Sequence, residues 1–192
     1  MEDGLFDVRC DFFDEQVQSA VRRQIFFQVA TAGMSDGERA RFAGLPQGCR
    51  MREGAKIIAP QNLRIGKNVW IGENAVLDAS GGLEIGSNTS IGLGVFVWTH
   101  DSHKLNRMGN NTSAAASFIR RKPTKIGERC FIAGPSVIMP GVTLGPGSVV
   151  APMSVIFHDT APESTNTPYR DMLALERRIA ELEKKVNQTS ER

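Results

Sequence analysis

The sequence predicts a mainly β protein, a parallel β-helix of hexapeptide repeats, because a six-residue period runs through two parts of the chain. In the later run every sixth residue is aliphatic, and its members are Ile126, Ile132, Ile138, Leu144, Val150 and Ile156. The earlier run has the same period with two extra residues at its middle, and its members are Ile65, Ile71, Leu77, Ile85, Ile91 and Val97. A small or β-branched residue also lies four positions after each of the first five aliphatic residues of the later run. A period of six fits neither an α-helix nor an alternating β-strand, and it is typical of a parallel β-helix.

Three hexads make one triangular coil of about eighteen residues, with the aliphatic side chain of each hexad pointing inward. Neighbouring coils stack roughly 4.8 Å apart, at the spacing of paired strands, so each coil is stabilised by its two neighbours. A glycine directly follows the aliphatic residue in several hexads, as at Gly72 and Gly127. We expect these glycines at tight corners, where a residue without a Cβ is favoured.

Residues 1–50 are predicted to form a helical cap over one open end of the β-helix, where unpaired backbone would otherwise be exposed. Residues 12–30 have the pattern of an amphipathic helix, with apolar residues at a spacing of four: Phe13, Val17, Val21 and Ile25. Residues 35–42 have the pattern of a second, shorter helix, because Ser35 is a suitable N-cap and Glu38 completes a capping box.

The β-helix is assigned to residues 51–162, and it contains a two-residue insertion at Gly81–Gly82. The insertion lengthens one coil to 20 residues, which places Asp78 beside Trp98 of the next coil and His100 two residues further along. Two interpretations of Asp78 stay open. Its carboxylate either contacts an acceptor molecule or hydrogen-bonds a bulged corner of the coil.

The six-residue period stops within residues 98–124, and a regular β-helix needs no such interruption. A long irregular segment inside a compact domain is typically functional, so we predict a protruding loop that forms part of an active site. His100 and His103 lie at the base of this loop, and histidine is the side chain best suited to take up a proton near neutral pH. The alternative is that both are exposed polar residues of an ordinary loop.

Residues 163–192 are predicted to form a linker followed by an amphipathic helix. Apolar residues alternate at spacings of three and four within residues 171–187: Met172, Leu175, Ile179, Leu182 and Val186. This pattern is an a/d heptad seam, and charged residues flank it. Two interpretations stay open: a helix that packs along its own β-helix, and a short three-stranded coiled coil that ties subunits together.

Composition limits the classes of function. The length of 192 residues predicts one domain, and the net charge of +2, from 23 basic and 21 acidic residues, argues against a general nucleic-acid binder. No segment has the pattern of a signal peptide or a membrane span, so no membrane partner is expected. The three cysteines lack metal-ligand spacing, and Cys130 falls on an inward small position. We therefore expect a cytoplasmic protein with no metal cofactor.

Residues 51–170 resemble the hexapeptide-repeat acyltransferases, in particular the branch of galactoside, maltose and streptogramin O-acetyltransferases. Five segments carry the resemblance: Asn74–Asp78, Thr99–Asp101, Pro123–Gly127, Ile138–Gly145 and Thr167–Arg170. The resemblance implies a left-handed β-helix, a homotrimer and active sites between adjacent subunits. It also implies transfer of an acetyl group from acetyl-CoA to a hydroxyl of a saccharide or another small hydroxylated acceptor.

The resemblance also implies roles for individual residues. His100 is the expected general base, which removes the proton from the acceptor hydroxyl, and His103 is a second candidate for that role. Three residues are expected to contact the acceptor: Asp78, Trp98 and Asp101. Six are expected to bind acetyl-CoA, small ones beside its pantetheine arm and basic ones beside its phosphates: Ala133, Gly134, Ala151, Arg120, Arg121 and Lys125.

Three other functions stay open. An N-acetyltransferase acting on an amino-sugar nucleotide would depend less on the base and more on an acidic partner. A zinc hydratase, another enzyme class with hexapeptide repeats, would use three histidines, and the chain has His100, His103 and His158. A non-catalytic scaffold would use the loop and the C-terminal helix for assembly. The chain also departs from the resemblance after Ile156, where it lacks the lysine expected at the 3′-phosphate of coenzyme A.

Overall fold

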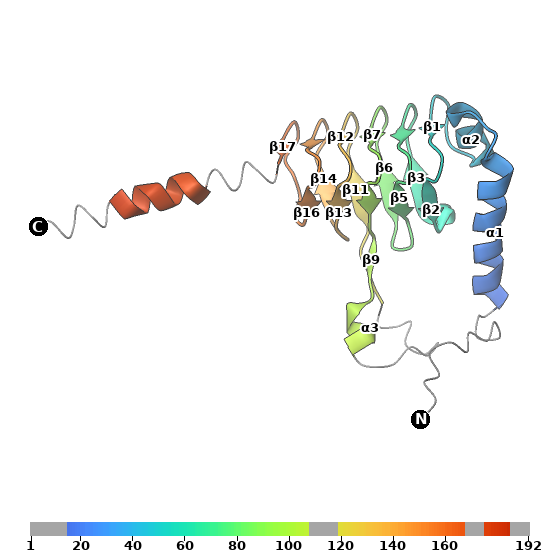
Figure 1. Ribbon diagram of the computed structural model, residues 1–192, viewed down its shortest axis with the longest axis horizontal. Helices are drawn as coiled ribbons and strands as arrows, with labels where there is room; N and C mark the ends of the chain where they lie inside the picture. The colour runs from blue at the N-terminus through green and yellow to red at the C-terminus, as the bar shows by residue number, and fades with distance from the viewer. Residues whose placement is uncertain (1–14, 108–118, 168–174, 185–192) are drawn as a thin grey trace, which may run out of the picture. The chain divides into compact units, whose positions relative to one another are not determined.

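The computed structural model in Figure 1 describes three stretches of the chain: residues 15–107, 119–167 and 175–184. The chain forms two compact units, residues 1–34 and residues 35–192. In the first unit α1 spans Glu15–Thr31, so a helix forms where the spacing of apolar residues predicts one. Phe13, the first residue of the predicted apolar stripe, lies outside the described residues.

The second unit begins with α2 (Asp36–Phe42), which packs against the first strand of the β-helix. The capping box predicted at its start is formed, because Glu38 Oε2 accepts hydrogen bonds from the backbone N–H and the hydroxyl of Ser35, at 2.9 and 2.7 Å. The buried Arg39 guanidinium donates to the carbonyl oxygen of Met51 at 2.8 Å. This bond ties α2 to the first coil.

Three parallel sheets form the three faces of the β-helix, and consecutive strands within a sheet come from consecutive coils. Sheet A contains β1 (Arg50–Met51), β4 (Trp70–Ile71), β7 (Ser90–Ile91), β12 (Phe131–Ile132), β15 (Val149–Val150) and β17 (Thr165–Asn166). Sheet B contains β2 (Lys56–Ile58), β5 (Val76–Asp78), β8 (Phe96–Val97), β13 (Val137–Ile138) and β16 (Val155–Ile156). Sheet C contains β3 (Leu63–Ile65), which follows the 3-10 helix η3 (Pro60–Asn62), and β6 (Leu83–Ile85), β11 (Thr124–Ile126) and β14 (Thr143–Leu144).

The core is a column of aliphatic side chains stacked from coil to coil, which confirms the predicted β-helix. In sheet A, Ile71 pairs with Ile91, Ile91 with Ile132 and Ile132 with Val150, and all four are fully buried. Burying one such side chain stabilises the fold by roughly 2 kcal/mol. The predicted small inward positions are also buried, including that of Cys130.

The glycines that follow the inward aliphatic residues are required for a different reason from the expected one. At Gly72 an added Cβ would lie 2.5 Å from the backbone carbon of Gly92 in the next coil, so close stacking excludes a side chain there. The left-handed corner conformation lies two residues later, at Asn74, with φ of 56°. Asparagine tolerates this conformation better than most residues, so the corner does not need glycine.

The predicted loop leaves the β-helix after β8 (Figure 1). It starts with β9 (His100–Asp101) and the short helix α3 (His103–Arg107), and it returns through β10 (Arg120–Arg121) into β11. β9 and β10 pair in antiparallel fashion, with Arg121 opposite His100. The loop therefore has an ordered two-stranded base at the point where the candidate bases lie.

Residues 175–184 form a helix near the C-terminus. Three members of the predicted apolar seam, Leu175, Ile179 and Leu182, lie on it and are exposed. The other two, Met172 and Val186, lie outside the described residues. In the parts of the chain that the structure describes, no helix combines the length and the apolar character needed to cross a membrane.

Candidate active site

A row of aromatic side chains on the outer face of sheet B leads to His100. Residues 95–100 alternate between the core and the outside, so Phe96, Trp98 and His100 share the outer face. The rings of Phe96 and Trp98 are stacked, with centroids 6.0 Å apart and planes inclined by 12°. The Trp98 and His100 rings meet edge to face at 5.9 Å and 88°. One flank of the imidazole is therefore an apolar wall.

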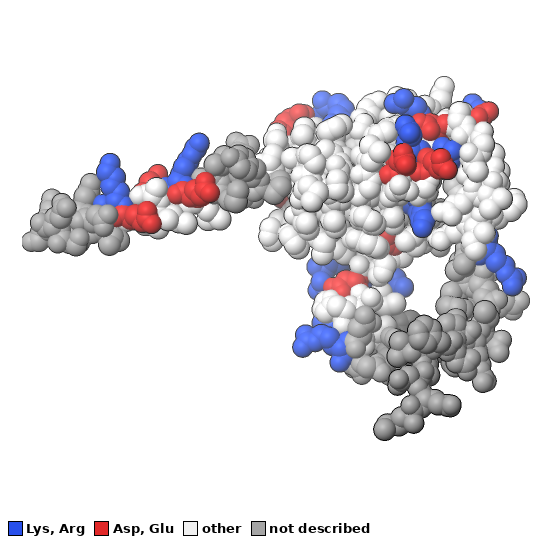
Figure 2. All heavy atoms as spheres, in the orientation of Figure 1, with Lys and Arg blue, Asp and Glu red and all other residues white. Residues whose placement is uncertain are grey.

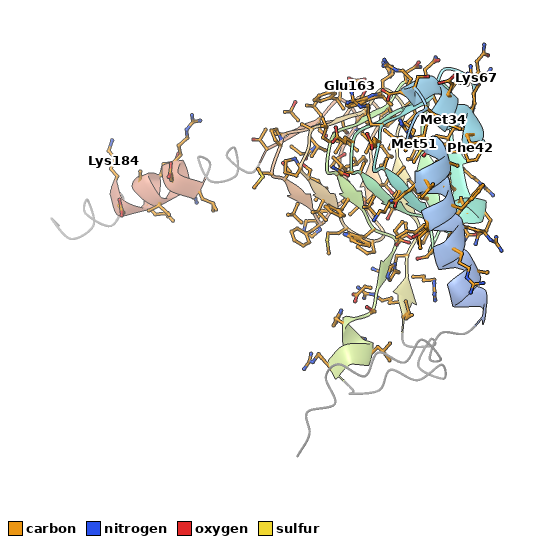
Figure 3. The ribbon with its side chains drawn as sticks, turned by 45° about the vertical axis from the view of Figure 1, so that its right-hand side comes forward. Met34, Phe42, Met51, Lys67, Glu163 and Lys184 are labelled. Atoms are coloured by element: carbon orange, nitrogen blue, oxygen red, sulfur yellow. The ribbon has the colours of Figure 1, made fainter. Side chains whose placement is uncertain are left out.

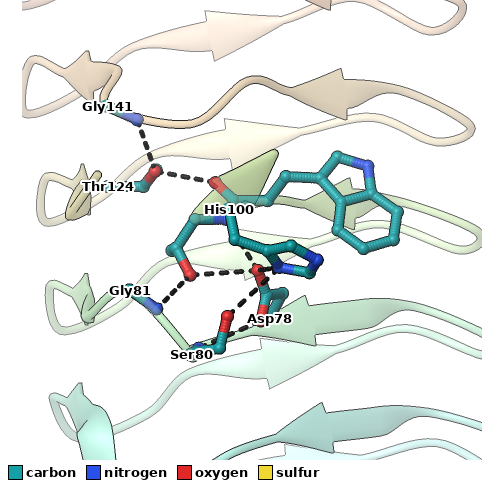
Figure 4. Close-up of polar contacts among 8 residues, drawn as sticks. Asp78, Ser80, Gly81, His100, Thr124 and Gly141 are labelled. Atoms are coloured by element: carbon teal, nitrogen blue, oxygen red, sulfur yellow. Dashed lines mark hydrogen bonds and ion pairs between the residues drawn. The ribbon is translucent and has the colours of Figure 1, made fainter. Parts of the chain in front are cut away.

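The other flank of His100 is held by a buried carboxylate from the neighbouring coil (Figure 4). Asp78 is fully buried, and its Oδ2 lies 2.7 Å from Nδ1 of His100. The same oxygen accepts hydrogen bonds from the backbone N–H and the hydroxyl of Thr99, at 2.9 and 3.0 Å. Asp78 Oδ1 accepts from the backbone N–H of Ser80 at 3.0 Å. The proximity of Asp78, Trp98 and His100 that the coil length predicts is thus present.

The environment of Asp78 keeps its carboxyl group ionised. Burial on its own would raise the pKa of Asp78, but hydrogen bonds from the backbone of Ser80 and Thr99, the Ser80 hydroxyl and His100 outweigh burial and lower this pKa to about 2. An ionised carboxylate only accepts hydrogen bonds, so the Nδ1 atom of His100 must carry a proton. In the neutral ring the lone pair is then on Nε2.

The Nε2 atom of His100 is left available for chemistry. No residue among those that the structure describes forms a hydrogen bond with it, and the side chain of His100 is 30% exposed. In Figure 4 every hydrogen bond drawn to the ring runs through its other nitrogen, Nδ1. Nε2 can therefore accept a proton from a molecule that approaches from solvent.

His103 has a different setting. Its Nδ1 atom contacts Asp101 Oδ1, but both residues belong to the loop and the His103 side chain is 59% exposed. Asp101 also lies 3.6 Å from the guanidinium of Arg120 on β10. The pKa of Asp101 is lowered, chiefly because its carboxylate accepts a hydrogen bond from the backbone N–H of His103.

Three further residues hold the His100 strand in place, and the sequence interpretation did not single them out. Thr99 accepts a hydrogen bond from the backbone N–H of Gly81 at 2.8 Å, within the two-residue insertion. The hydroxyl of Thr124 donates to the carbonyl oxygen of Trp98 at 2.8 Å and accepts from the N–H of Gly141 at 3.1 Å. Ser80 Oγ lies 3.1 Å from Nδ1 of His100. The insertion next to Ser80 was the sequence signal that could have identified this residue.

The residues expected to bind acetyl-CoA are divided between two regions. Ala133 and Ala151 occupy the same corner of successive coils, at the ends of β12 and β15, and both are half-buried. Lys125 lies instead on β11 of sheet C, where its ammonium is 3.5 Å from Glu84. It therefore lies on a different face from the alanines, and it belongs to an ion-paired ladder with Glu84 and Arg64.

The remaining candidates lie beside Ala133 and on β10 at the base of the loop. Gly134 follows Ala133 and packs so tightly against the backbone of Leu93 that no side chain would fit. Arg120 and Arg121 are exposed on β10, directly opposite Asp101 and His100. The structure thus brings the two arginines next to the candidate base.

A polar depression of about 530 Å³ opens next to Ser80, and Gln61, Asn62 and Arg121 contribute to its lining. Figure 2 shows mixed acidic and basic side chains in the region of β3 and β6, and a largely uncharged surface over β13 and β16. Within the described stretches, no three or more His, Cys, Asp or Glu side chains converge as metal ligands would.

Comparison with known proteins identifies the repeats. Residues 62–98 match the family model described as "Hexapeptide repeat of succinyl-transferase", and residues 123–158 match "Bacterial transferase hexapeptide (six repeats)". The chain is 32% identical over 108 residues to the "Putative colanic acid biosynthesis acetyltransferase WcaF" of Escherichia coli strain K12, a match that covers 56% of this chain and 54% of that protein. It is 34% identical over 103 residues to the "Putative acetyltransferase SAR2635" of Staphylococcus aureus strain MRSA252, covering 54% and 49%. The chain thus spans about half the length of the curated relatives it matches.

Solved structures support the fold. The hexapeptide-repeat containing acetyltransferase VCA0836 of Vibrio cholerae matches with a TM-score of 0.63 and 21% identity, covering 81% of this chain and 90% of that chain. A galactoside acetyltransferase in complex with coenzyme A matches with a TM-score of 0.58 and 22% identity, covering 82% and 81%. The chain is therefore a hexapeptide-repeat protein with the fold of the hexapeptide-repeat acetyltransferases.

Proposed function

We propose that this protein is an acetyl-CoA-dependent O-acetyltransferase that acts on a hydroxyl of a saccharide or another small hydroxylated acceptor, with His100 as general base. The observation that carries the proposal is the contact between the buried Asp78 carboxylate and Nδ1 of His100, at 2.7 Å. This contact supports the tautomer in which Nδ1 carries the proton, which leaves the lone pair on Nε2 of a ring that is 30% exposed. The acetyltransferase names of the relatives support the same reaction class.

In the proposed reaction, Nε2 of His100 takes the proton from the acceptor hydroxyl while the acceptor oxygen attacks the thioester carbonyl carbon of acetyl-CoA. The tetrahedral intermediate collapses by breaking its carbon–sulfur bond, and His100 returns the proton to the departing sulfur. The products are the acetyl ester and coenzyme A, so the base is regenerated. Asp78 stabilises the imidazolium that exists between these two proton transfers.

Asp78 is thereby assigned a positioning role rather than contact with the acceptor. Its side chain has no exposed surface, and hydrogen bonds from Ser80, Thr99 and His100 occupy its oxygens. An acceptor hydroxyl could reach it only by displacing one of these donors. The second interpretation of Asp78 offered by the sequence, a hydrogen-bonding role at the bulged corner, is the one that this geometry favours.

Trp98 keeps its proposed role at the acceptor. The stacked rings of Phe96 and Trp98 make an apolar surface that ends at His100, so an acceptor with an apolar face packs there while its hydroxyl reaches Nε2. Sugar rings and larger alicyclic alcohols both have such a face. Asp101 remains a candidate contact at the edge of this surface.

Acetyl-CoA is proposed to lie along the corner formed by Ala133 and Ala151, because their small side chains leave the backbone of two successive coils accessible. Arg121 is the proposed phosphate contact, since it is an exposed cation on β10. Arg120 is a weaker candidate because Asp101 lies 3.6 Å from its guanidinium. Lys125 is a weaker candidate because Glu84 already pairs with its ammonium. A homotrimer with sites between adjacent subunits completes the proposal.

The test is release of free thiol from acetyl-CoA in the presence of matched hydroxyl and amine acceptors. The proposal requires release that depends on a hydroxyl acceptor and that is lost in His100→Ala. Preference for amine acceptors with little dependence on His100 would indicate an N-acetyltransferase instead. No thiol release with either panel would support a non-catalytic scaffold.

A further inference from the structure

The helix formed by residues 175–184 carries an exposed apolar stripe that the proposed reaction does not use. Leu175, Ile179 and Leu182 are 64%, 55% and 46% exposed. They follow one another at spacings of four and three, so they lie on one side of the helix. Large aliphatic side chains aligned in this way usually mark a surface that another helix covers.

Charged residues on both flanks of the stripe indicate which helix covers it. With Leu175 and Leu182 at heptad position d and Ile179 at position a, position g falls on Arg178 and position e on Glu176 and Glu183. One flank of the seam is therefore basic and the other acidic. A helix with this distribution is complementary to a copy of itself.

The charges also select the relative direction of the two helices. In a parallel pair the g residue of one helix faces the e residue five positions later on the other, so Arg178 of one copy faces Glu183 of a second copy. In an antiparallel pair g faces g and e faces e, so with Ile179 packed against Leu182 of the second copy, Glu176 would face Glu183 and basic g residues would face each other. Only the parallel arrangement brings opposite charges together.

We propose that the helix of residues 175–184 is a parallel self-association element that pairs with the same helix of other copies of this chain. A helix of this length is marginal alone in water, so the contact depends on the high local concentration that an oligomeric body provides. In that respect the inference rests on the homotrimer of the proposed function. It adds the surface, the partner and the direction of the contact.

The first test is disulfide cross-linking in the full chain with Leu182→Cys at position d. The matched control is Lys184→Cys at position f, two residues away, where the side chain projects from the helix (Figure 3). Cys10 is replaced by serine in both, and the remaining native cysteines, Cys49 and Cys130, are buried. Under mild oxidation we expect covalent dimers from Leu182→Cys at least tenfold faster than from Lys184→Cys. Equal rates, or no cross-link at all, would overturn the proposal.

The second test reverses charge in the Leu182→Cys background. Arg178→Glu places an acidic residue opposite Glu183 of the second copy, and the same repulsion occurs on both sides of the helix pair. Together these repulsions should slow cross-linking roughly tenfold. Arg177→Glu at position f is the control for a charge reversal away from the seam, and it should change the rate less than twofold. Arg178→Glu also removes the ion pair between Arg178 and Glu181 of the same helix, at 3.0 Å, so the double variant below is needed to separate that loss from the contact between copies.

The double variant Arg178→Glu/Glu183→Arg should restore the cross-linking rate, because it exchanges the two partners of the parallel pair. Equal slowing by Arg177→Glu and Arg178→Glu, or no rescue in the double variant, would contradict the parallel seam. Cross-linking is measured without substrate, so its failure is distinguishable from failure of the acetyltransferase proposal. Thiol release from acetyl-CoA by the same variants should stay within about twofold of the parent.

Discussion

Two histidine–aspartate pairs have their histidines three positions apart in the chain, and they differ in burial and in the origin of the aspartate. His100 pairs with Asp78, 22 positions earlier in the chain and one coil away, and this carboxylate is fully buried. His103 pairs with Asp101, two positions earlier in the same loop, and the His103 side chain is 59% exposed. The residue types are the same, but only the first pair is built into the β-helix.

The difference shows what fixes an imidazole for catalysis. The His100–Asp78 pair is held by backbone N–H groups of Ser80 and Thr99, which belong to stacked coils and cannot move independently. The His103–Asp101 pair is held by the backbone N–H of His103 in the same turn and by the exposed Arg120 at 3.6 Å. A base that must keep one tautomer and one direction needs the first kind of support.

The largest expected effect is on the buried pair. His100→Ala should lower kcat/KM for acetyl transfer by roughly 10²–10⁴, because general base catalysis contributes about that much. The measurement is initial-rate thiol release at saturating acetyl-CoA, with acetyl-CoA binding followed separately. Activity within tenfold of the parent would show that another group removes the proton.

Asp78→Asn comes next, with an expected loss of roughly 10² in kcat. An asparagine amide can donate to Nδ1, which would leave the proton on Nε2 and make it useless as a base. KM for the acceptor should stay within about threefold, because Asp78 does not touch it. A large rise in KM with unchanged kcat would instead indicate a direct acceptor contact. Circular dichroism would confirm that the variant is folded.

Acid stability should distinguish the two carboxylates. The folded-state pKa of Asp78 is about 2, below its ordinary value of 3.8, so Asp78 stabilises the fold fully above about pH 4, and this stabilisation is lost as pH falls towards 2. The shift corresponds to about 2 kcal/mol. Urea unfolding of the parent between pH 2 and pH 5 should therefore be steeper in pH than that of Asp78→Asn. The Asp101 side chain is 23% exposed and screened more by solvent than Asp78, so Asp101→Asn should follow the parent, and an equal change in both variants would contradict this distinction.

Trp98→Ala should lower kcat/KM about tenfold. It removes the edge-to-face contact with His100 and half of the apolar wall. Trp98→Phe keeps an aromatic ring and should recover most of the activity. If both variants behave like the parent, the aromatic row is not part of the acceptor site.

The smallest effect is expected for His103→Ala, whose kcat/KM should stay within about threefold of the parent. Its ring is exposed, and its partner is a neighbour in the same loop. Measured beside His100→Ala under identical conditions, this variant tests the comparison directly. A loss as large as that of His100→Ala would indicate that His103 takes part in the proton transfer. It would contradict the inference that the buried Asp78 carboxylate identifies His100 as the base.

Much of the fold could be predicted because its signal repeats. Each aliphatic residue of the six-residue period needs only its own coil and the next to be buried, so the pattern Ile71, Ile91, Ile132 is visible without knowing the rest of the structure. The reason for the glycines was missed, because close approach of Gly72 to Gly92 is a property of two stacked coils and not of one hexad.

The candidate site was predictable in position but not in orientation. Counting residues through the Gly81–Gly82 insertion brought Asp78, Trp98 and His100 together. The same counting could not show that the Asp78 carboxylate is buried and contacts His100. Nor could it show that Thr124 of the returning strand donates a hydrogen bond to the carbonyl oxygen of Trp98. Counting hexads does separate Lys125 from Ala133, because the two lie in successive hexads, and the structure places them on sheets C and A.

The sequence alone therefore determined the repeat, the inward positions and the place where the loop interrupts them. All three depend only on the spacing of residues along the sequence. Packing of the coils was needed to establish which of two histidines has a buried partner and which ring nitrogen is left for the acceptor. This is because a hydrogen bond between coils depends on stacking distance and side-chain direction. Both are set only when the coils stack and bring Asp78 Oδ2 within 2.7 Å of Nδ1 of His100, 22 positions later in the chain.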